Sequence, residues 1–216
     1  METVTLLITQ EKVPVALPKH KPLITTDAYF KYERAAEDRH IYLDGEIYAM
    51  AGESAFHADI SANIMISLGS QLKGKRCRAR TKDTKVRSGP GLSERPQTRG
   101  MFSYPDIVVI CGEPEYHDEH KDIVTNPTAI IEVLSPATEG FDRGAKFTNY
   151  QIWNPTLKDY LLVSQDKPQF EHFSRQADGT WSYQLHTGLD AAVSINSIQC
   201  KLTAVDVYDR IEFETP

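Results

Sequence analysis

The predicted fold depends on two stretches, YPDIVVIC at residues 104–111 and AIIEVL at residues 129–134. Each is almost continuously apolar and rich in β-branched residues, which is typical of strands that are buried on both faces. Each also carries one acid, Asp106 in the first and Glu132 in the second. A buried acid costs several kcal/mol unless it is paired or bound to a cation. The alternatives are that Asp106 caps a turn after Pro105 and that Glu132 pairs with a buried Arg.

The surrounding segments predict a mixed α/β arrangement. A Thr cap at residues 25–26 begins a helix, and Asp44-Gly45 joins two alternating runs as a tight hairpin. A second helix is expected at residues 55–73, because apolar residues recur there every four positions. That stripe consists of Phe56, Ile60, Ile64, Leu68 and Leu72.

Further elements follow on both sides of the two deciding stretches. We expect strands at residues 76–87 and 159–164, a helix at 141–153, and short antiparallel strands after it. The predicted fold class is therefore α/β, with a mixed central sheet flanked by helices, an N-terminal hairpin and a C-terminal antiparallel extension. Residues 1–23 are expected to be a loosely ordered lead-in, and residues 24–216 a single domain.

Composition narrows the class of protein. The chain has 216 residues, 40% of them hydrophobic and 25% charged, with a net charge of −6. Its apolar runs are shorter than the roughly 20 residues of a membrane helix, and it lacks a secretory signal pattern. The three cysteines are odd in number and far apart. We therefore expect a soluble cytoplasmic protein without a membrane partner, and with neither a disulfide framework nor a zinc site.

One segment is strongly basic. Residues 73–87, KGKRCRARTKDTKVR, contain eight basic residues and one acid. Such a strip on an acidic body can attract a phosphate backbone, and Arg78, Arg80 and Lys82 are the candidate substrate contacts. The alternative is a strand with a solvated Lys/Arg face.

The two strand acids predict a metal site if their strands are neighbours in the sheet. Two carboxylates held close together repel each other, and a divalent cation relieves that repulsion. Carboxylate oxygens suit Mg²⁺ or Mn²⁺ better than zinc. A bound cation neutralises phosphate charge and lowers the pKa of a bound water, as phosphodiester hydrolysis requires.

These features resemble the PD-(D/E)XK nuclease superfamily, with its restriction-endonuclease-like core, and more closely its Uma family of restriction endonucleases. The matching segments span residues 29–175: LDGEIYAMAG, FHADI, YPDIVVICG, NPTAIIEVLSPATEGFDRGAKFTNYQI and DYLLVS. The resemblance implies a Mg²⁺-dependent endonuclease that acts on DNA as a homodimer, with Asp106 and Glu132 as metal ligands.

The resemblance also implies roles for three further residues. The superfamily motif places a lysine where this chain has Leu134, and in the Uma family the matching lysine is Lys146, on the following helix. A surface Lys146 paired with Asp142 is the alternative. Glu46 matches a hairpin acid that would be a further catalytic group and metal ligand. His57 matches a position that could contact a phosphate or a metal-bound water, although a helix-start His is often only a cap.

Two other functions stay open at this point. The absence of a lysine at position 134 and the net negative charge also suit a catalytically inactive nucleic-acid-binding or assembly protein that keeps the fold. A metal-dependent hydrolase of another phosphoester is the third possibility, because nothing in the sequence recognises bases directly.

Overall fold

The computed structural model describes residues 22–50, 52–91 and 97–213. Nearly all of the lead-in expected at residues 1–23 therefore lies outside the described residues. None of the helices in the described ranges is long and apolar enough to cross a membrane.

A six-stranded sheet forms the centre of the molecule. Its strand order is β11-β10-β9-β8-β6-β3, and only β8 and β9 run parallel to each other. The strands are β3 (Cys77–Thr81), β6 (Ile107–Cys111), β8 (Ala129–Leu134), β9 (Asp159–Ser164), β10 (Gln169–Arg175) and β11 (Trp181–Thr187). The mixed direction of this sheet confirms the predicted fold class.

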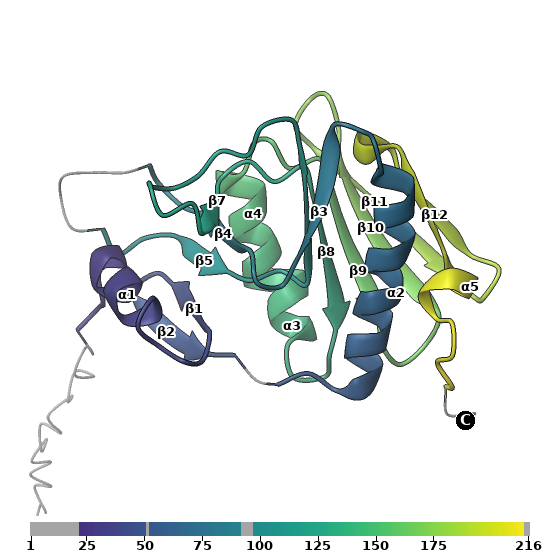
Figure 1. Ribbon diagram of the computed structural model, residues 1–216, viewed down its shortest axis with the longest axis horizontal. Helices are drawn as coiled ribbons and strands as arrows, with labels where there is room; N and C mark the ends of the chain where they lie inside the picture. The colour runs from purple at the N-terminus through teal and green to yellow at the C-terminus, as the bar shows by residue number, and fades with distance from the viewer. Residues whose placement is uncertain (1–21, 51, 92–96, 214–216) are drawn as a thin grey trace, which may run out of the picture.

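Helices cover both faces of the large sheet (Figure 1). Alternate residues of β6 point to opposite faces, as a strand's period of two requires. Val109 packs on α2 (Ala55–Leu72), together with a C-terminal unit of β12 (Ala192–Ile195), η2 (Asn196–Ile198), β13 (Cys200–Thr203) and α5 (Ala204–Val207). Val108 packs on α4 (Phe147–Trp153) on the other side.

A second, five-stranded sheet lies beside the first, in the order β2-β1-β5-β4-β7. It consists of β1 (His40–Leu43), β2 (Glu46–Ala49), β4 (Lys85–Ser88), β5 (Met101–Ser103) and β7 (Ile123–Val124). The predicted hairpin is confirmed, with positive φ at both Asp44 (45°) and Gly45 (94°). Thr25 caps α1 (Thr26–Glu33), which packs aromatic residues against this sheet.

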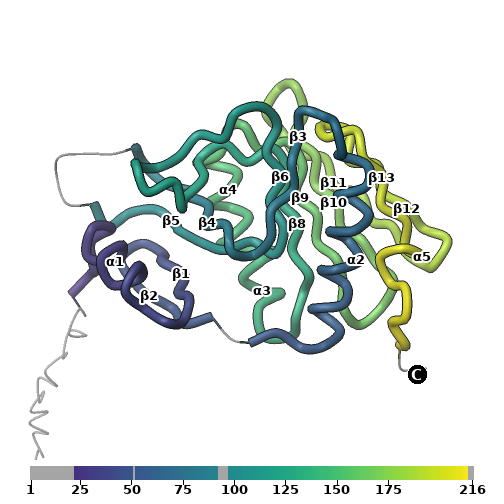
Figure 2. The backbone as a smooth tube through the Cα atoms, viewed as in Figure 1, coloured from purple at the N-terminus to yellow at the C-terminus, as the bar shows by residue number. Residues whose placement is uncertain are grey.

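The strand predicted at residues 76–87 is in fact two strands in different sheets. β3 belongs to the large sheet and β4 to the small one, with a turn at residues 82–84 between them. The chain returns to the large sheet between β5 and β6. Figure 2 shows both crossings, with β4 and β5 to the left of β3 and β6. Alternating basic residues continue through the turn, so their pattern gave no sign of the break.

Two helix predictions also need correction. Phe56 is 50% exposed and does not belong to the buried stripe of α2, where His57 takes the inward position. The helix predicted at residues 141–153 has three parts: α3 (Glu139–Phe141), a kinked segment η1 (Asp142–Lys146) and α4. The axis is interrupted at Gly144, whose φ and ψ are −103° and −105°.

The prediction for the cysteines is wrong for one pair. Antiparallel pairing of β3 with β6 places Cys77 directly opposite Cys111, and the two form a disulfide across 34 residues of chain. Cys200 is free and buried. Distance along the chain did not indicate this pairing, because it follows from the register of two strands.

Candidate active site

Asp106 and Glu132 meet where β6 begins and β8 approaches its end. Ile107 pairs with Ile131, so Asp106 and Glu132 occupy the next opposed positions. The backbone N–H of Asp106 donates to Oε2 of Glu132 at 3.2 Å. The N–H of Val133 donates to Oδ2 of Asp106 at 2.7 Å. Each carboxylate is therefore held by the backbone of the other strand, and the prediction that the two strands are neighbours is confirmed.

Lys146 completes this cluster. Its Nζ lies 2.7 Å from Oε1 of Glu132 and 3.0 Å from Oδ1 of Asp142. The residue is only 5% exposed. The alternative of a surface lysine paired with Asp142 alone is therefore wrong, because the same ammonium also serves the strand acid.

The break in the helix places this amine. Asp142 and Lys146 are the first and last residues of η1, and both are buried on the side that faces the sheet. The hydroxyl of Tyr160 on β9 donates to the carbonyl of Asp142 at 2.9 Å, which fixes this segment to the sheet.

The charged groups of this cluster shift one another's pKa values. Burial raises the pKa of Glu132 to about 8, and Asp142 and Asp106 act in the same direction, against the opposing charge of Lys146. Burial also acts against the charge of Lys146, but the carboxylates of Glu132 and Asp142 outweigh it and raise the lysine's pKa well above its ordinary value. For Asp106, burial acts against the charge, yet contact with His57 and the nearby Lys146 bring the pKa below the ordinary value.

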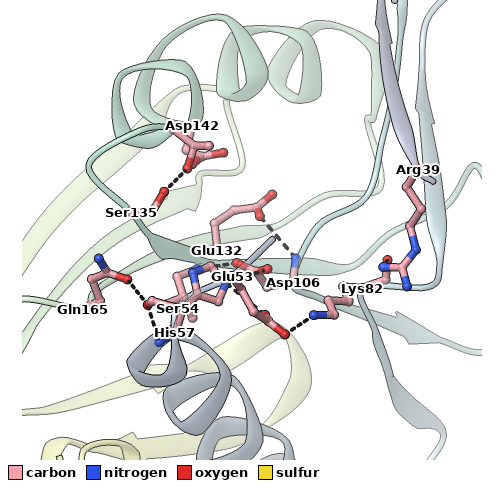
Figure 3. Close-up of polar contacts among 12 residues, drawn as sticks. Arg39, Glu53, Ser54, His57, Lys82, Asp106, Glu132, Ser135, Asp142 and Gln165 are labelled. Carbon is pink, nitrogen blue, oxygen red and sulfur yellow. Dashed lines mark hydrogen bonds and ion pairs between the residues drawn. The ribbon is translucent and has the colours of Figure 1, made fainter. Parts of the chain in front are cut away.

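His57 connects the first turn of α2 to Asp106. Its Nε2 lies 3.0 Å from Oδ1 of Asp106 and 3.8 Å from Oε2 of Glu53. Glu53 in turn forms an ion pair with Lys82, which follows β3. Figure 3 shows this chain of contacts from Lys82 through Glu53 and His57 to the acids.

Ser54 orients the start of α2 at the site. Its hydroxyl accepts from the backbone N–H of His57 and donates to the side chain of Gln165 at 3.2 Å. Sequence reasoning missed Glu53, Ser54 and Gln165 as site residues. The Ser at the position before Ala55 is a standard cap signal and could have been found, whereas Gln165 follows β9 and is close only in three dimensions.

Glu46 is not among the residues brought together here. It lies exposed on β2, where the hydroxyl of Tyr48 donates to its carboxylate. It also lines a cavity of about 510 Å³ beside α1, together with Leu23, Tyr32 and His40. The structure thus places Glu46 on the small sheet, whereas Asp106 and Glu132 meet on the large one.

The basic segment is divided among different environments. Arg78 is exposed on β3, and Arg80 donates to the hydroxyl of Tyr116 at 2.9 Å. Lys85 is buried and ion-paired with Glu33. The interpretation as one solvated face therefore fails for the second half of the segment, while Arg78, Arg80 and Lys82 remain on the side that leads to Asp106.

Comparison with known proteins identifies the family of this chain. The Uma2 family, described as "Putative restriction endonuclease", matches residues 26–204. The chain belongs to the Uma2 family. The uncharacterised protein slr1290 of Synechocystis sp. is 33% identical over 160 residues, which is 74% of this chain and 78% of that protein. A second uncharacterised Synechocystis protein, sll1609, is 31% identical over 159 residues, 74% of this chain and 85% of that protein.

A solved structure shares the Uma2 chain's fold. It is described as a "putative nuclease belonging to DUF820" from Anabaena variabilis, and it matches with a TM-score of 0.66 at 18% identity. The match covers 86% of this chain and 97% of that one. The mixed α/β fold expected from the sequence is thus shared with a solved structure.

One observation tests whether these Uma2 residues fit a divalent ion. Oε1 of Glu132 is buried and is contacted by the ammonium of Lys146 at 2.7 Å, but no other donor among the described residues reaches it. An oxygen with an unused lone pair beside a second carboxylate, Asp106, suits Mg²⁺, which is often held by one or two carboxylates plus water and phosphate oxygens. Within the described ranges, no three His, Cys, Asp or Glu side chains form a complete ligand set. Water or substrate would have to complete the coordination.

Leu134 accounts for the departure from the superfamily motif in this Uma2 chain. It is 4% exposed and packs in the apolar cluster on the α4 side of the sheet. A lysine at this position would bury its charge among apolar side chains. The amine near Glu132 is instead that of Lys146, on the helix side of the same cluster.

Proposed function

We propose that this protein is a Mg²⁺-dependent endonuclease that hydrolyses phosphodiester bonds in DNA. Its family and its fold support the nuclease class. The observation that carries the finer proposal is the buried cluster of Asp106, Glu132 and Lys146 at the ends of two neighbouring strands. Cytoplasmic location, expected partly from the cysteines, stays a prediction.

In the proposed site, Asp106 and Glu132 hold the ion. When bound, Mg²⁺ would supply positive charge for the phosphate and an acidified water. Lys146 keeps the Glu132 carboxylate in place and provides a fixed positive charge for the transition state. His57 is a positioning residue, since it fixes the orientation of Asp106 by contact with Oδ1.

β3 provides a path for the nucleic-acid backbone. Thr81 pairs with Ile107, so Lys82 lies at the next position, beside Asp106. Arg78, Arg80 and Lys82 alternate along β3 and its end and share one side of the strand. Such a row of cations suits the phosphates of a nucleic-acid backbone. The phosphate to be cleaved would then lie beside the two acids at the end of the row. This row supports nucleic acid over a small phosphoester as the substrate.

The decisive experiment is a cleavage assay on plasmid DNA, linear duplex, single-stranded DNA and RNA with Mg²⁺, Mn²⁺, Ca²⁺ or EDTA. We expect DNA cleavage with Mg²⁺ or Mn²⁺ and none in EDTA. Asp106→Asn and Glu132→Gln should reduce cleavage to background with an unchanged circular dichroism spectrum. Glu46→Gln, on the other sheet, serves as the matched acid control and should stay active. Full activity in EDTA, or in Asp106→Asn, would refute the proposal.

A second candidate is a nucleic-acid-binding protein that keeps the fold without catalysis. One observation favours it: Lys146 already offsets the charge of Glu132 without any ion. Calorimetric titration with Mn²⁺ separates the two functions. The nuclease requires binding that is lost in Asp106→Ala, whereas equal heats from the wild type and the variant would favour the binding protein.

A further inference from the structure

The two edges of the large sheet differ in how they are protected. β3 forms one edge, is five residues long and carries Arg78 and Arg80. β11 forms the other edge, is seven residues long and has the sequence WSYQLHT. Residues 179–189 contain no Lys, Arg, Asp, Glu or Pro. Charged residues and Pro are the usual means by which an edge strand avoids pairing with another chain, so β11 is an unprotected edge.

Two of the exposed side chains on β11 are large and apolar. Tyr183 and Leu185 are each 52% exposed and point to the same face, two positions apart. Burial lowers the pKa of His186, as does the nearby His172, so the strand is uncharged at neutral pH. An exposed and uncharged strand of this length can pair its free backbone groups with another strand.

The aromatic layer under α4 continues out to this edge. Phe147 packs on Phe173 with ring centroids 4.6 Å apart, and Phe173 packs on Tyr183 at 5.0 Å. Tyr183 is the outermost ring of the row and half of its surface remains exposed. A further strand alongside β11 would extend the core of the sheet and cover this ring.

We propose that β11 pairs antiparallel with β11 of a second copy of this chain, so that the two large sheets become continuous. A two-fold axis through Gln184 places Tyr183 opposite the partner's Leu185, and Leu185 opposite the partner's Tyr183. The apolar residues of both copies then meet on one face. This self-complementarity, together with the absence of charge, favours a second copy over a different protein, because a two-fold interface uses the same surface twice.

The oligomeric state tests this inference. We expect the full-length wild type to be a dimer by sedimentation equilibrium and light scattering. Leu185→Lys and Leu185→Glu should both be monomers with an unchanged circular dichroism spectrum, since either charge would have to be buried against the partner's Tyr183. Ile66→Lys is the matched control, because Ile66 is 71% exposed on α2, and it should remain a dimer. A monomeric wild type, or dimeric Leu185 variants, would overturn the inference.

Cross-linking tests the register. Gln184→Cys places two thiols across the axis at the spacing of a directly opposed strand pair, which is within disulfide reach. We expect a covalent dimer on mild oxidation, and none from Ile66→Cys. The native cysteines do not compete, since Cys77 and Cys111 are bonded to each other and Cys200 is buried. A Gln184→Cys protein that stays uncross-linked would overturn this register. Both results are independent of nuclease activity, so the interface and the proposed function can fail separately.

Discussion

At the scale of single residues, the charge balance around Glu132 determines both the stability of the cluster and its chemistry. Glu132 is 2% exposed, and Nζ of Lys146 lies 2.7 Å from its Oε1. Among the described residues, Lys146 is the only cation that contacts the Glu132 carboxylate. Replacing Glu132 and replacing Lys146 should therefore lower the free energy of unfolding by very different amounts.

Glu132→Gln should leave the free energy of unfolding within about 1 kcal/mol of the wild type in EDTA, because Lys146 keeps Asp142 as its partner. Lys146→Met should cost about 3 kcal/mol, because it leaves two buried carboxylates without a cation. Urea denaturation at pH 8 measures both values. Equal losses for the two variants would contradict this account of the cluster, whatever their activity.

The sequence predicted the acids of the site but only part of their surroundings. An acid within an apolar run is visible in one dimension, which is why Asp106 and Glu132 could be found. Lys146 was identified by family resemblance, because its contact with Glu132 depends on the kink in η1, which the sequence does not reveal. Glu53 and Gln165 lie far along the chain from both acids, so only the packing of α2 against the sheet brings them together.

At the scale of elements, β3 combines two roles that its sequence suggested only separately. It is the charged edge of the large sheet, and its end lies beside Asp106 through the pairing with β6. The break between β3 and β4 was not predicted, because local alternation does not reveal which sheet a strand joins. The interrupted helix was missed for a similar reason, since Gly144 alone does not distinguish a kink from a continuous helix.

Arg78→Gln should weaken DNA binding without unfolding the protein, because Arg78 is exposed on the edge strand. If its guanidinium contacts one phosphate, the slope of log affinity against log salt should decrease in magnitude by about 0.7 to 0.9. Fluorescence anisotropy with Ca²⁺ in place of Mg²⁺, over a range of salt concentrations, measures this slope. Lys73→Gln, also exposed and outside β3, is the matched control; an equal effect of both variants would argue against a defined path along β3.

At the scale of the whole molecule, a second buried charge cluster joins β9 to β10 below the C-terminal hairpin. Oδ1 of Asp159 lies 2.7 Å from Nε2 of His172 and accepts from the hydroxyl of Ser174 at 3.0 Å. Burial acts against the charge of Asp159, but the contacts with His172 and Ser174 outweigh it and lower the pKa of this carboxyl. The native state therefore favours the ionised form more than the unfolded chain does.

This cluster should make the protein sensitive to acid. A carboxyl with a lowered native pKa contributes stability above its unfolded pKa, near 3.8, and loses it as the pH falls through the lower native value. Asp159→Asn should cost about 2 kcal/mol at pH 7, and the gap to the wild type should narrow below pH 4. Chemical denaturation over pH 3 to 7 checks both statements. A gap that stays constant down to pH 3 would show that Asp159 contributes by packing alone.

Two of the crossings of the chain between the sheets, β3 to β4 and β5 to β6, also bear on the position of the acids. The first begins at Lys82, directly after β3, and the second leads from β5 to Asp106. Asp106 and Glu132 therefore lie where the chain passes between the small and the large sheet. Both connections, from β3 to β4 and from β5 to β6, tie the small sheet to the large one at this point. Because the chain passes from β5 to Asp106 within three residues, the position of the small sheet helps to fix the position of this carboxylate.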